Sequence, residues 1–223
     1  MKPLSRADLD LITARTIDYY ERNAVSFWAG TCDHDVTQNY EAFFGALPVR
    51  PGLKLLDFGC GPGRDLAYFK GLGHEAVGLE GTPAFCEMAR AHSGCEVWNQ
   101  NFLALQLPPA GFDGIFANAS LFHVPRQELT RVLSELAEAL VPGGVLFSSN
   151  PRGVGQEGWS GDRYGTYLEW DEYQTYLDSA GFAPLKHYFR PPGLPLEDQH
   201  ILAVVSRKKR NHSVNVARYA RGI

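Results

Sequence analysis

A glycine-rich turn directly after an apolar run is the first place in the chain where chemistry is expected. The stretch reads LLDFGCGPGRD, with Gly59, Gly61 and Gly63 after residues 55–58. Glycines at such a turn let a ligand approach the backbone closely. The spacing is not G-x-G-x-x-G, Pro62 interrupts it, and no Gly-Lys-Ser/Thr follows. The turn is therefore a poor match for a pyrophosphate.

Polar residues end the apolar runs that follow. Glu80 ends EAVGLE, where a carboxylate can accept hydrogen bonds from both hydroxyls of a ribose. Asn101 follows CEVWNQ, and Asn118 and Ala119 end a later run, GFDGIFANA. Glu80 can also be interpreted as a surface acid beside a helix, and Asn101 as a turn residue.

The elements that position these residues follow from the order of apolar and helical segments. Short apolar runs alternate with helical patterns, which predicts an α/β fold with a parallel sheet covered on both faces. The clearest helix is expected over 127–140, and another over 169–181. Two late apolar segments, 183–190 and 200–208, predict an antiparallel hairpin at the sheet edge.

The chain is expected to fold as a single domain over residues 1–206. Within it, residues 1–50 are predicted to form a cap over the ligand crevice, because FWAGTCDHDVTQNYEAFF is rich in aromatic and polar residues. Residues 207–223 carry six of the 21 Lys and Arg residues and no acidic residue. We expect this basic tail to be disordered or docked on a partner.

Composition favours small-molecule chemistry. The net charge is −4, and most of the basic surplus lies in the tail, so the remainder is acidic and would repel a nucleic-acid backbone. The four cysteines form no CxxC or Cys/His pattern, which indicates reduced thiols and no metal site. No signal peptide or long apolar segment is found, so we expect a cytoplasmic protein with no membrane or nucleic-acid partner.

The motif D-x-G-x-G-x-G after a strand resembles motif I of class I S-adenosylmethionine-dependent methyltransferases. LVPGGVLFSSN also resembles the fifth-strand motif of that family. The resemblance implies a Rossmann-like fold with a mostly parallel seven-stranded sheet, helices on both faces, an antiparallel edge hairpin, and S-adenosyl-L-methionine as cofactor. The cofactor-binding residues that it implies are Asp57, Gly59, Gly61, Gly63, Glu80, Gly81, Asn101, Phe102, Asn118 and Ala119.

Four further segments narrow the resemblance. FWAGTCDHDVTQN, SLFHVP, SSNPRGVGQEGW and HYFRPPGLP resemble the C-terminal methyltransferase domain of ovothiol synthases, which N-methylates the imidazole of a 5-thiohistidine. The resemblance covers roughly Thr16 to Arg207 and implies a free-standing enzyme of ovothiol biosynthesis, with a separate sulfoxide synthase as partner. Glu80 and Asn101 depart from the family pattern, which has Asp at both places. An Asn in place of Asp at position 101 removes a negative charge near the adenine.

Several residues are candidates for contact with the methyl acceptor. His34 and His123 can hydrogen-bond or deprotonate it because an imidazole titrates near neutrality, although either can be a structural histidine. Arg152 and Arg163 can bind a carboxylate, or can be solvated loop charges. The other candidates are Trp28 and Tyr164 as aromatic walls, Asp35 as an ammonium partner or helix cap, and Asn150.

Three other functions compete with this one. The chain could methylate another small-molecule amine, thiol or carboxylate, which changes only the acceptor pocket. It could be a non-catalytic cofactor-binding module, but the polar DHDVTQN segment argues against that. A nucleic-acid methyltransferase recruited by RKKR is disfavoured by the acidic body and by the lack of an Asn-Pro-Pro-Tyr-type motif after the fourth strand.

Overall fold

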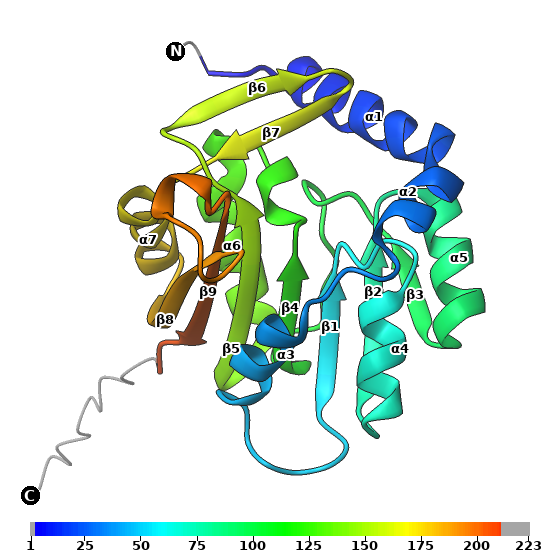
Figure 1. Ribbon diagram of the computed structural model, residues 1–223, viewed down its shortest axis with the longest axis vertical. Coiled ribbons are helices and arrows are strands. Elements are labelled where there is room, and N and C mark those ends of the chain that lie inside the picture. The colour runs from blue at the N-terminus through cyan, green and yellow to red at the C-terminus, as the bar shows by residue number, and fades with distance from the viewer. Residues whose placement is uncertain (1–2, 211–223) are drawn as a thin grey trace, which may run out of the picture.

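A seven-stranded sheet runs through the centre of the molecule, in a computed structural model that describes residues 3–210 (Figure 1). The strands are β1 Lys54–Phe58, β2 Glu75–Glu80, β3 Glu96–Asn99, β4 Phe112–Asn118, β5 Leu140–Pro151, β8 Phe182–Arg190 and β9 Ile201–Lys208. Their order is β3-β2-β1-β4-β5-β9-β8. The first five are mutually parallel, and β9 is antiparallel to both of its neighbours. The Rossmann-like methyltransferase fold and its antiparallel edge hairpin are thus confirmed.

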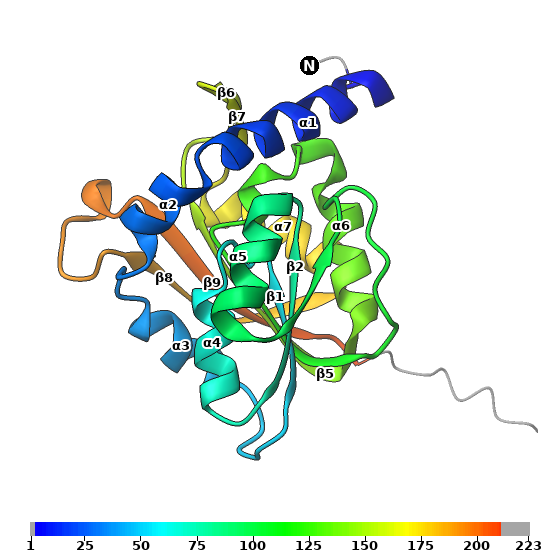
Figure 2. The same ribbon diagram turned by 90° about the vertical axis from the view of Figure 1, so that its right-hand side faces the viewer.

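Helices cover both faces of this sheet. One layer contains α3 Thr37–Phe44, α4 Arg64–Gly71 and α5 Pro83–Ser93, and the other contains α6 Arg126–Ala139 and α7 Trp170–Ser179 (Figures 1 and 2). Adjacent residues of a strand face opposite layers, so Leu55 packs in the cluster of Phe43 and Phe69 while Leu56 packs in that of Leu133. Burial of both faces explains why the strands read as continuous apolar runs. No helix within residues 3–210 is long and apolar enough to cross a membrane.

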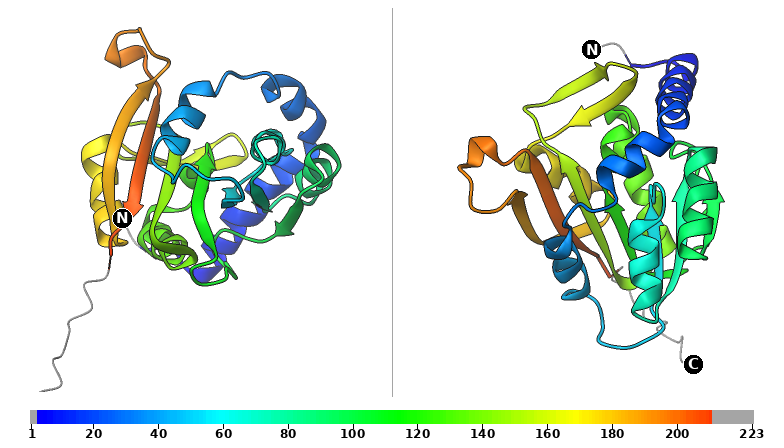
Figure 3. Two further views of the ribbon diagram at one scale, coloured as in Figure 1. Left: turned by 90° about the horizontal axis from the view of Figure 1, so that it is seen from below. Right: turned by 45° about the vertical axis from the view of Figure 1, so that its right-hand side comes forward.

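Two more helices and a small hairpin lie over the carboxyl ends of the parallel strands. They are α1 Arg6–Arg22, α2 Ala24–Thr31, β6 Gln156–Ser160 and β7 Arg163–Tyr167 (Figure 3). A capping box starts α1: the Asp8 N–H donates to Ser5 Oγ, and the Ser5 N–H donates to the Asp8 carboxylate. The sequence predicted a cap over residues 1–50, but α3 packs on the sheet face instead, and the β6–β7 hairpin was not predicted.

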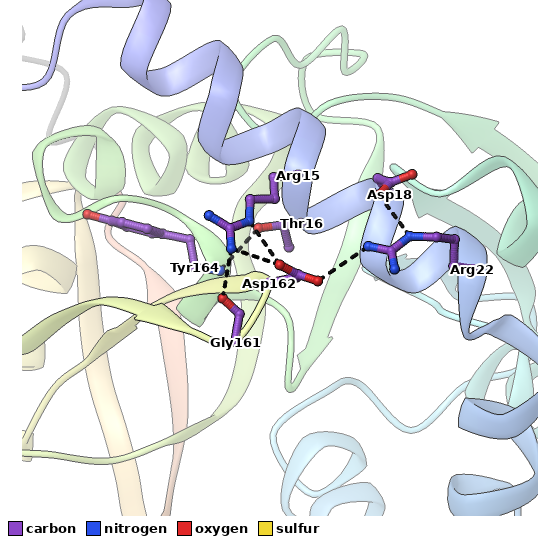
Figure 4. A network of polar contacts seen from close by, with 7 residues as sticks. All are labelled: Arg15, Thr16, Asp18, Arg22, Gly161, Asp162 and Tyr164. Carbon is purple, nitrogen blue, oxygen red and sulfur yellow. Dashed lines mark hydrogen bonds and ion pairs between the residues drawn. The ribbon is translucent and has the colours of Figure 1, made fainter.

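The hairpin turn holds α1 in place through residues far away in the sequence (Figure 4). Arg15 Nε and Nη2 donate to Asp162 Oδ1 at 3.0 and 2.8 Å, and Arg22 Nη2 lies 3.4 Å from Asp162 Oδ2. Beneath these exposed ion pairs, the buried Tyr164 N–H donates to Thr16 Oγ1 at 3.1 Å. Exposed ion pairs contribute little individually, so the buried bond and the packing below them matter more.

The predicted basic tail begins later than residue 207. Arg207 and Lys208 belong to β9, and Arg207 donates to the carbonyl oxygens of Gly143 and Ala46, both at 2.9 Å. These two residues are therefore part of the fold. The last part of the predicted tail, residues 211–223, lies outside the described residues.

Candidate cofactor and acceptor site

A cavity of about 770 Å³ lies at the carboxyl ends of the parallel strands, beneath α1 and α2. Its walls come from both helices, from the glycine turn after β1, from the ends of β2 and β4, and from the end of β8. Ligands of open α/β sheets bind at this edge, and the volume is in the range of small-molecule sites. A cofactor and a small acceptor can therefore lie together in this cavity.

The glycine turn contributes two of its three glycines to this cavity. Gly59 and Gly61 line it, whereas Gly63 does not. Gly63 caps α4 with a positive φ of 92°, and a Cβ there would lie 2.8 Å from the Cα of Ala89 in α5. Asp57 also lies outside the cavity, buried below the turn, and burial raises its pKa well above the usual range. The third glycine thus lets two helices approach each other, and the cofactor-binding roles predicted for Gly63 and Asp57 stay predictions.

Glu80 lines the cavity from the end of β2. Its Oε2 accepts from the Gly61 N–H at 3.0 Å, and its Oε1 accepts from the Thr82 N–H at 2.9 Å. Burial raises the pKa of Glu80, and these two backbone bonds counteract the rise. Its carboxylate lines the cavity and can accept from the hydroxyls of a ligand. This arrangement fits a ribose.

Asn101, Phe102 and Gly81 line the same side of the cavity. The Phe102 ring packs on Phe58, with 4.4 Å between the ring centroids. Asn101 Oδ1 accepts from the Leu103 N–H at 2.8 Å, so this side chain also shapes the turn, as its alternative interpretation expected. The wall suits a flat aromatic group such as adenine.

Asn118 and Ala119 line the cavity after β4. Ala119 has a positive φ of 58°, which is uncommon for a residue other than glycine and is concentrated at functional sites. Asn118 is fixed by two amide contacts, since its Oδ1 accepts from Asn39 and its Nδ2 donates to Asp65 at 3.4 Å. Asp65 is in turn paired with Arg64, whose Nε donates to it at 2.8 Å. The two charges compensate each other locally.

His123 is held by hydrogen bonds on both ring nitrogens. Nδ1 lies 2.7 Å from the Tyr164 carbonyl oxygen, which can only accept, so Nδ1 carries the proton. Nε2 lies 2.8 Å from the Tyr20 hydroxyl and must therefore accept from it. Burial lowers the pKa of His123 to about 4, and the nearby Arg163 adds to this effect. His123 is thus a neutral hydrogen-bond acceptor at neutral pH and a weak base.

Three more predicted acceptor residues also line the cavity: His34, Asp35 and Trp28. Asp35 Oδ1 accepts from the Thr37 N–H at 2.9 Å at the start of α3, so it also stabilises that helix end. The Trp28 ring packs edge-on against His92, with 5.0 Å between centroids. The structure brings these residues together with the glycine turn, and their roles in binding stay predictions.

Four other candidates lie outside the cavity. Arg152 is paired with Glu169, with Nε 3.0 Å from both carboxylate oxygens, and Arg163 stacks on Tyr19. Asn150 Oδ1 accepts from the Phe122 N–H. Tyr164 is buried, and only its backbone carbonyl reaches the site, through His123. The two arginines proposed as carboxylate ligands therefore have other partners.

Tyr20 and Arg190 are two of the cavity residues that were not singled out from the sequence. Tyr20 lies near the end of α1 and Arg190 at the end of β8. Arg190 lies in HYFRPPGLP, a segment used for the resemblance, but nothing in that segment distinguishes it from Arg152 or Arg163. Tyr20 reads as one more aromatic residue of an amphipathic helix.

Comparison with known proteins identifies the central part of the chain. Residues 55–144 match a family profile described as "Methyltransferase domain". The structure of 1,6-didemethyltoxoflavin-N1-methyltransferase from Burkholderia thailandensis, solved with 1,6-didemethyltoxoflavin and S-adenosylhomocysteine, is similar with a TM-score of 0.72. The two sequences are 21% identical, and the match covers 94% of this chain and 93% of that one. Residues 55–144 therefore form a methyltransferase domain with the class I fold.

Two relatives from sequence comparison are also methyltransferases. The 24-methylenesterol C-methyltransferase 2 of Oryza sativa subsp. japonica is 33% identical over 67% of this chain and 47% of that protein. The 27-O-demethylrifamycin SV methyltransferase of Amycolatopsis mediterranei is 28% identical over 73% of this chain and 68% of its own length. The chain thus spans less than half of the sterol enzyme. These findings and the ribose-compatible Glu80 support S-adenosylmethionine as the cofactor.

Proposed function

We propose that this protein transfers the methyl group of S-adenosylmethionine to a ring nitrogen of a 5-thiohistidine. The observation that carries the proposal is the hydrogen-bonded chain from the cavity through Tyr20 and His123 to the Tyr164 carbonyl. The proposal also rests on the resemblance of four segments to the methyltransferase domain of ovothiol synthases. These segments include residues of α2 and of the ends of β5 and β8.

The direction of the hydrogen bonds determines what Tyr20 offers to a ligand. Because His123 Nε2 accepts the hydroxyl proton, the Tyr20 oxygen has only its two lone pairs to offer in other directions, and Arg163 donates to one of them. It can therefore accept from an N–H group and cannot donate to a ring nitrogen. Burial raises the pKa of Tyr20, partly opposed by a hydrogen bond with Arg163, so the hydroxyl stays protonated at neutral pH.

An imidazole acceptor matches this arrangement. A neutral imidazole has one N–H and one nitrogen with a free lone pair, and methylation needs the free lone pair. By accepting the N–H, Tyr20 fixes the tautomer and orients the opposite nitrogen. Bound S-adenosylmethionine would supply a methyl group on a sulfonium sulfur. The free ring nitrogen takes this methyl group by in-line displacement, S-adenosylhomocysteine leaves, and the ring N–H proton is released to solvent after the transfer. His123 and the Tyr164 carbonyl act as positioning groups behind Tyr20.

The proposed acceptor needs a supplier. Plain histidine lacks the ring sulfur, so an enzyme that forms a carbon–sulfur bond on the imidazole must act earlier. A separate sulfoxide synthase would belong to the required reaction class. We therefore place this protein after such a step in the reaction sequence.

The proposal is tested by incubating the purified protein with S-adenosylmethionine and 5-thiohistidine, histidine, glycine or a phenol, and measuring product masses. We expect methylated 5-thiohistidine, with histidine a much poorer substrate. Tyr20→Phe should lower kcat on the order of 10- to 100-fold, the effect of losing one buried hydrogen bond. Tyr19→Phe is the control. Equal methylation of histidine and 5-thiohistidine, or preferred methylation of glycine or the phenol, would exclude the assignment.

A larger nitrogen heterocycle is the second candidate acceptor. The name of the structural relative from Burkholderia thailandensis places its methyl group on N1 of a fused heterocycle. The apolar residues Ile12, Ile17, Phe27 and Phe85 line this cavity and suit such a ring. An N–H group on that ring could use Tyr20 in the same way. Preferred turnover of fused heterocycles in the same assay would favour this candidate.

A further inference from the structure

The cavity contains two arginines, and only one of them is neutralised. Arg64 is paired with Asp65, at 2.8 Å from Nε to Oδ1. Arg190 has no acidic partner at ion-pair distance among the described residues. Its single hydrogen bond runs from Nη2 to the backbone oxygen of Asp35 at 2.7 Å, and its Nε is buried without a partner. A buried N–H of a guanidinium left without an acceptor is costly, so the site is built for an additional acceptor.

Arg190 enters the cavity from a different part of the sheet than the residues assigned to the cofactor. It ends β8, the edge strand, and pairs in register with Ile201 of β9. The glycine turn and Glu80 follow β1 and β2, and β4, β5 and β9 separate these strands from β8. The strand order therefore favours the acceptor over the cofactor as the ligand of Arg190.

An acidic side chain lies beside Arg190 without binding it directly. Asp35 lines the cavity, and its Oδ1 accepts from the Thr37 N–H. That backbone bond is the main cause that lowers the pKa of Asp35, and the charge of Arg190 contributes. The two side chains form no ion pair within 4.0 Å in the described part of the chain. A cation and an anion thus face one end of the cavity as separate groups.

We propose that Arg190 and Asp35 bind the α-amino-acid group of the methyl acceptor, with the carboxylate on Arg190 and the ammonium on Asp35. A guanidinium presents a planar fork that matches a carboxylate, and Arg190 makes one hydrogen bond to the described residues, from Nη2, which leaves donors for a ligand. Asp35 would repel a simple carboxylate but attracts the ammonium of a zwitterion. This inference rests on the proposed function, because it assigns the other end of the acceptor whose ring faces Tyr20.

The cofactor also ends in an α-amino-acid group, so Arg190 and Asp35 could bind this group of either the acceptor or the cofactor. The position of Arg190 beyond β5 and β9 favours the acceptor. The two sources are separated by measuring the affinity of S-adenosylhomocysteine on its own, and then the affinity of the acceptor for the protein saturated with it.

The experiment uses calorimetry on the full chain and on Arg190→Gln, with 5-thiohistidine and its decarboxylated analogue 5-thiohistamine as probes. Arg190→Gln should lower the affinity for 5-thiohistidine about 10- to 100-fold, the usual effect of losing hydrogen bonds to a charged group. The affinity for 5-thiohistamine and for S-adenosylhomocysteine should stay within about two-fold of the parent. Arg152→Gln is the matched control, because its guanidinium is paired with Glu169 outside the cavity.

Several outcomes would overturn the inference. They are no measurable binding of 5-thiohistidine to the parent, equal affinities of the parent and Arg190→Gln, or a loss confined to S-adenosylhomocysteine. Unchanged midpoints of thermal unfolding verify that the variants are folded. A second variant, Arg190→Lys, keeps the charge but not the planar fork, and its loss of affinity for 5-thiohistidine should be intermediate. Turnover in the same samples decides the proposed function separately. Tight, Arg190-dependent binding without methyl transfer would refute the reaction while supporting the inference.

Discussion

Replacing Gly63 by alanine tests whether the third glycine of the turn serves helix packing. A Cβ at this position would lie 2.8 Å from Ala89 Cα, 3.0 Å from its Cβ and 3.1 Å from its carbonyl oxygen. Two of these atoms are backbone of the buried helix α5 and the third is a Cβ fixed to it, so none can move aside as the end of a flexible side chain would. We therefore expect Gly63→Ala to force α4 and α5 apart.

The magnitude is obtained by comparison with Gly73→Ala. Gly73 has a φ of 81°, close to the 92° of Gly63, but a Cβ there would meet no atom within 4 Å. Both substitutions have the cost of a left-handed alanine, about 1–2 kcal/mol. Gly63→Ala adds overpacking, typically about 1–3 kcal/mol. Its free energy of unfolding should therefore fall by about 1–3 kcal/mol more than that of Gly73→Ala.

Urea unfolding of the parent and both variants, with S-adenosylhomocysteine absent, measures this difference directly. Equal losses for the two variants would refute the packing argument. An intact stability for Gly63→Ala combined with a lost affinity for S-adenosylhomocysteine would instead assign Gly63 to the cofactor, as the sequence alone predicted.

Two further predictions concern groups that line the cavity. Glu80→Gln should lower the affinity for S-adenosylhomocysteine on the order of 10- to 100-fold, because the ribose hydroxyls lose a charged acceptor. Glu75→Gln, on the exposed start of the same strand, is the control and should leave the affinity unchanged. Equal calorimetric affinities of the Glu80 variant and the parent would remove Glu80 from the site. His123 keeps its neutral form when folded, with a pKa of about 4, so the unfolded chain takes up the proton first as the pH falls below the ordinary value of about 6.5. The stability of the parent relative to His123→Asn should be constant above that pH and fall by up to about 3 kcal/mol towards pH 4, and parallel urea-derived stability curves of the two proteins would contradict the buried neutral state.

Much of the fold could be predicted from the sequence because both faces of the sheet are buried. The runs 53–58, 111–117 and 143–150 read as strands for that reason and lie largely within β1, β4 and β5, and the glycine turn is local. The β6–β7 hairpin was missed because its sequence, QEGWSGDRYGTY, is polar and glycine-rich. The hairpin is held by α1, and a contact between segments so far apart in the chain produces no periodic pattern of apolar residues in the sequence of either segment.

The arginines show where sequence reasoning about the site ends. Position along the chain places Arg152 and Arg163 after the fifth strand, but their partners, Glu169 and the Tyr19 ring, are set by tertiary packing. Arg190 reaches the cavity because β8, which is antiparallel to β9, runs in the same direction as β1–β5 and so ends at the carboxyl edge of the sheet. No local pattern ranks these three side chains as ligands.

The hydrogen bonds that join the N-terminal segment, including α1, to the rest of the molecule have a consequence for the order of folding. Leu4 contacts Gln127, Arg15 contacts Asp162, and Tyr20 contacts His123, so each bond joins segments more than 100 residues apart. Such contacts require long loops to close, and they form after the local ones. The sheet and its glycine turn can therefore assemble before α1 docks. Ligand bound beneath α1 then stabilises the last folding step most strongly, so amide hydrogens of α1 should gain the greatest protection when the cavity is filled.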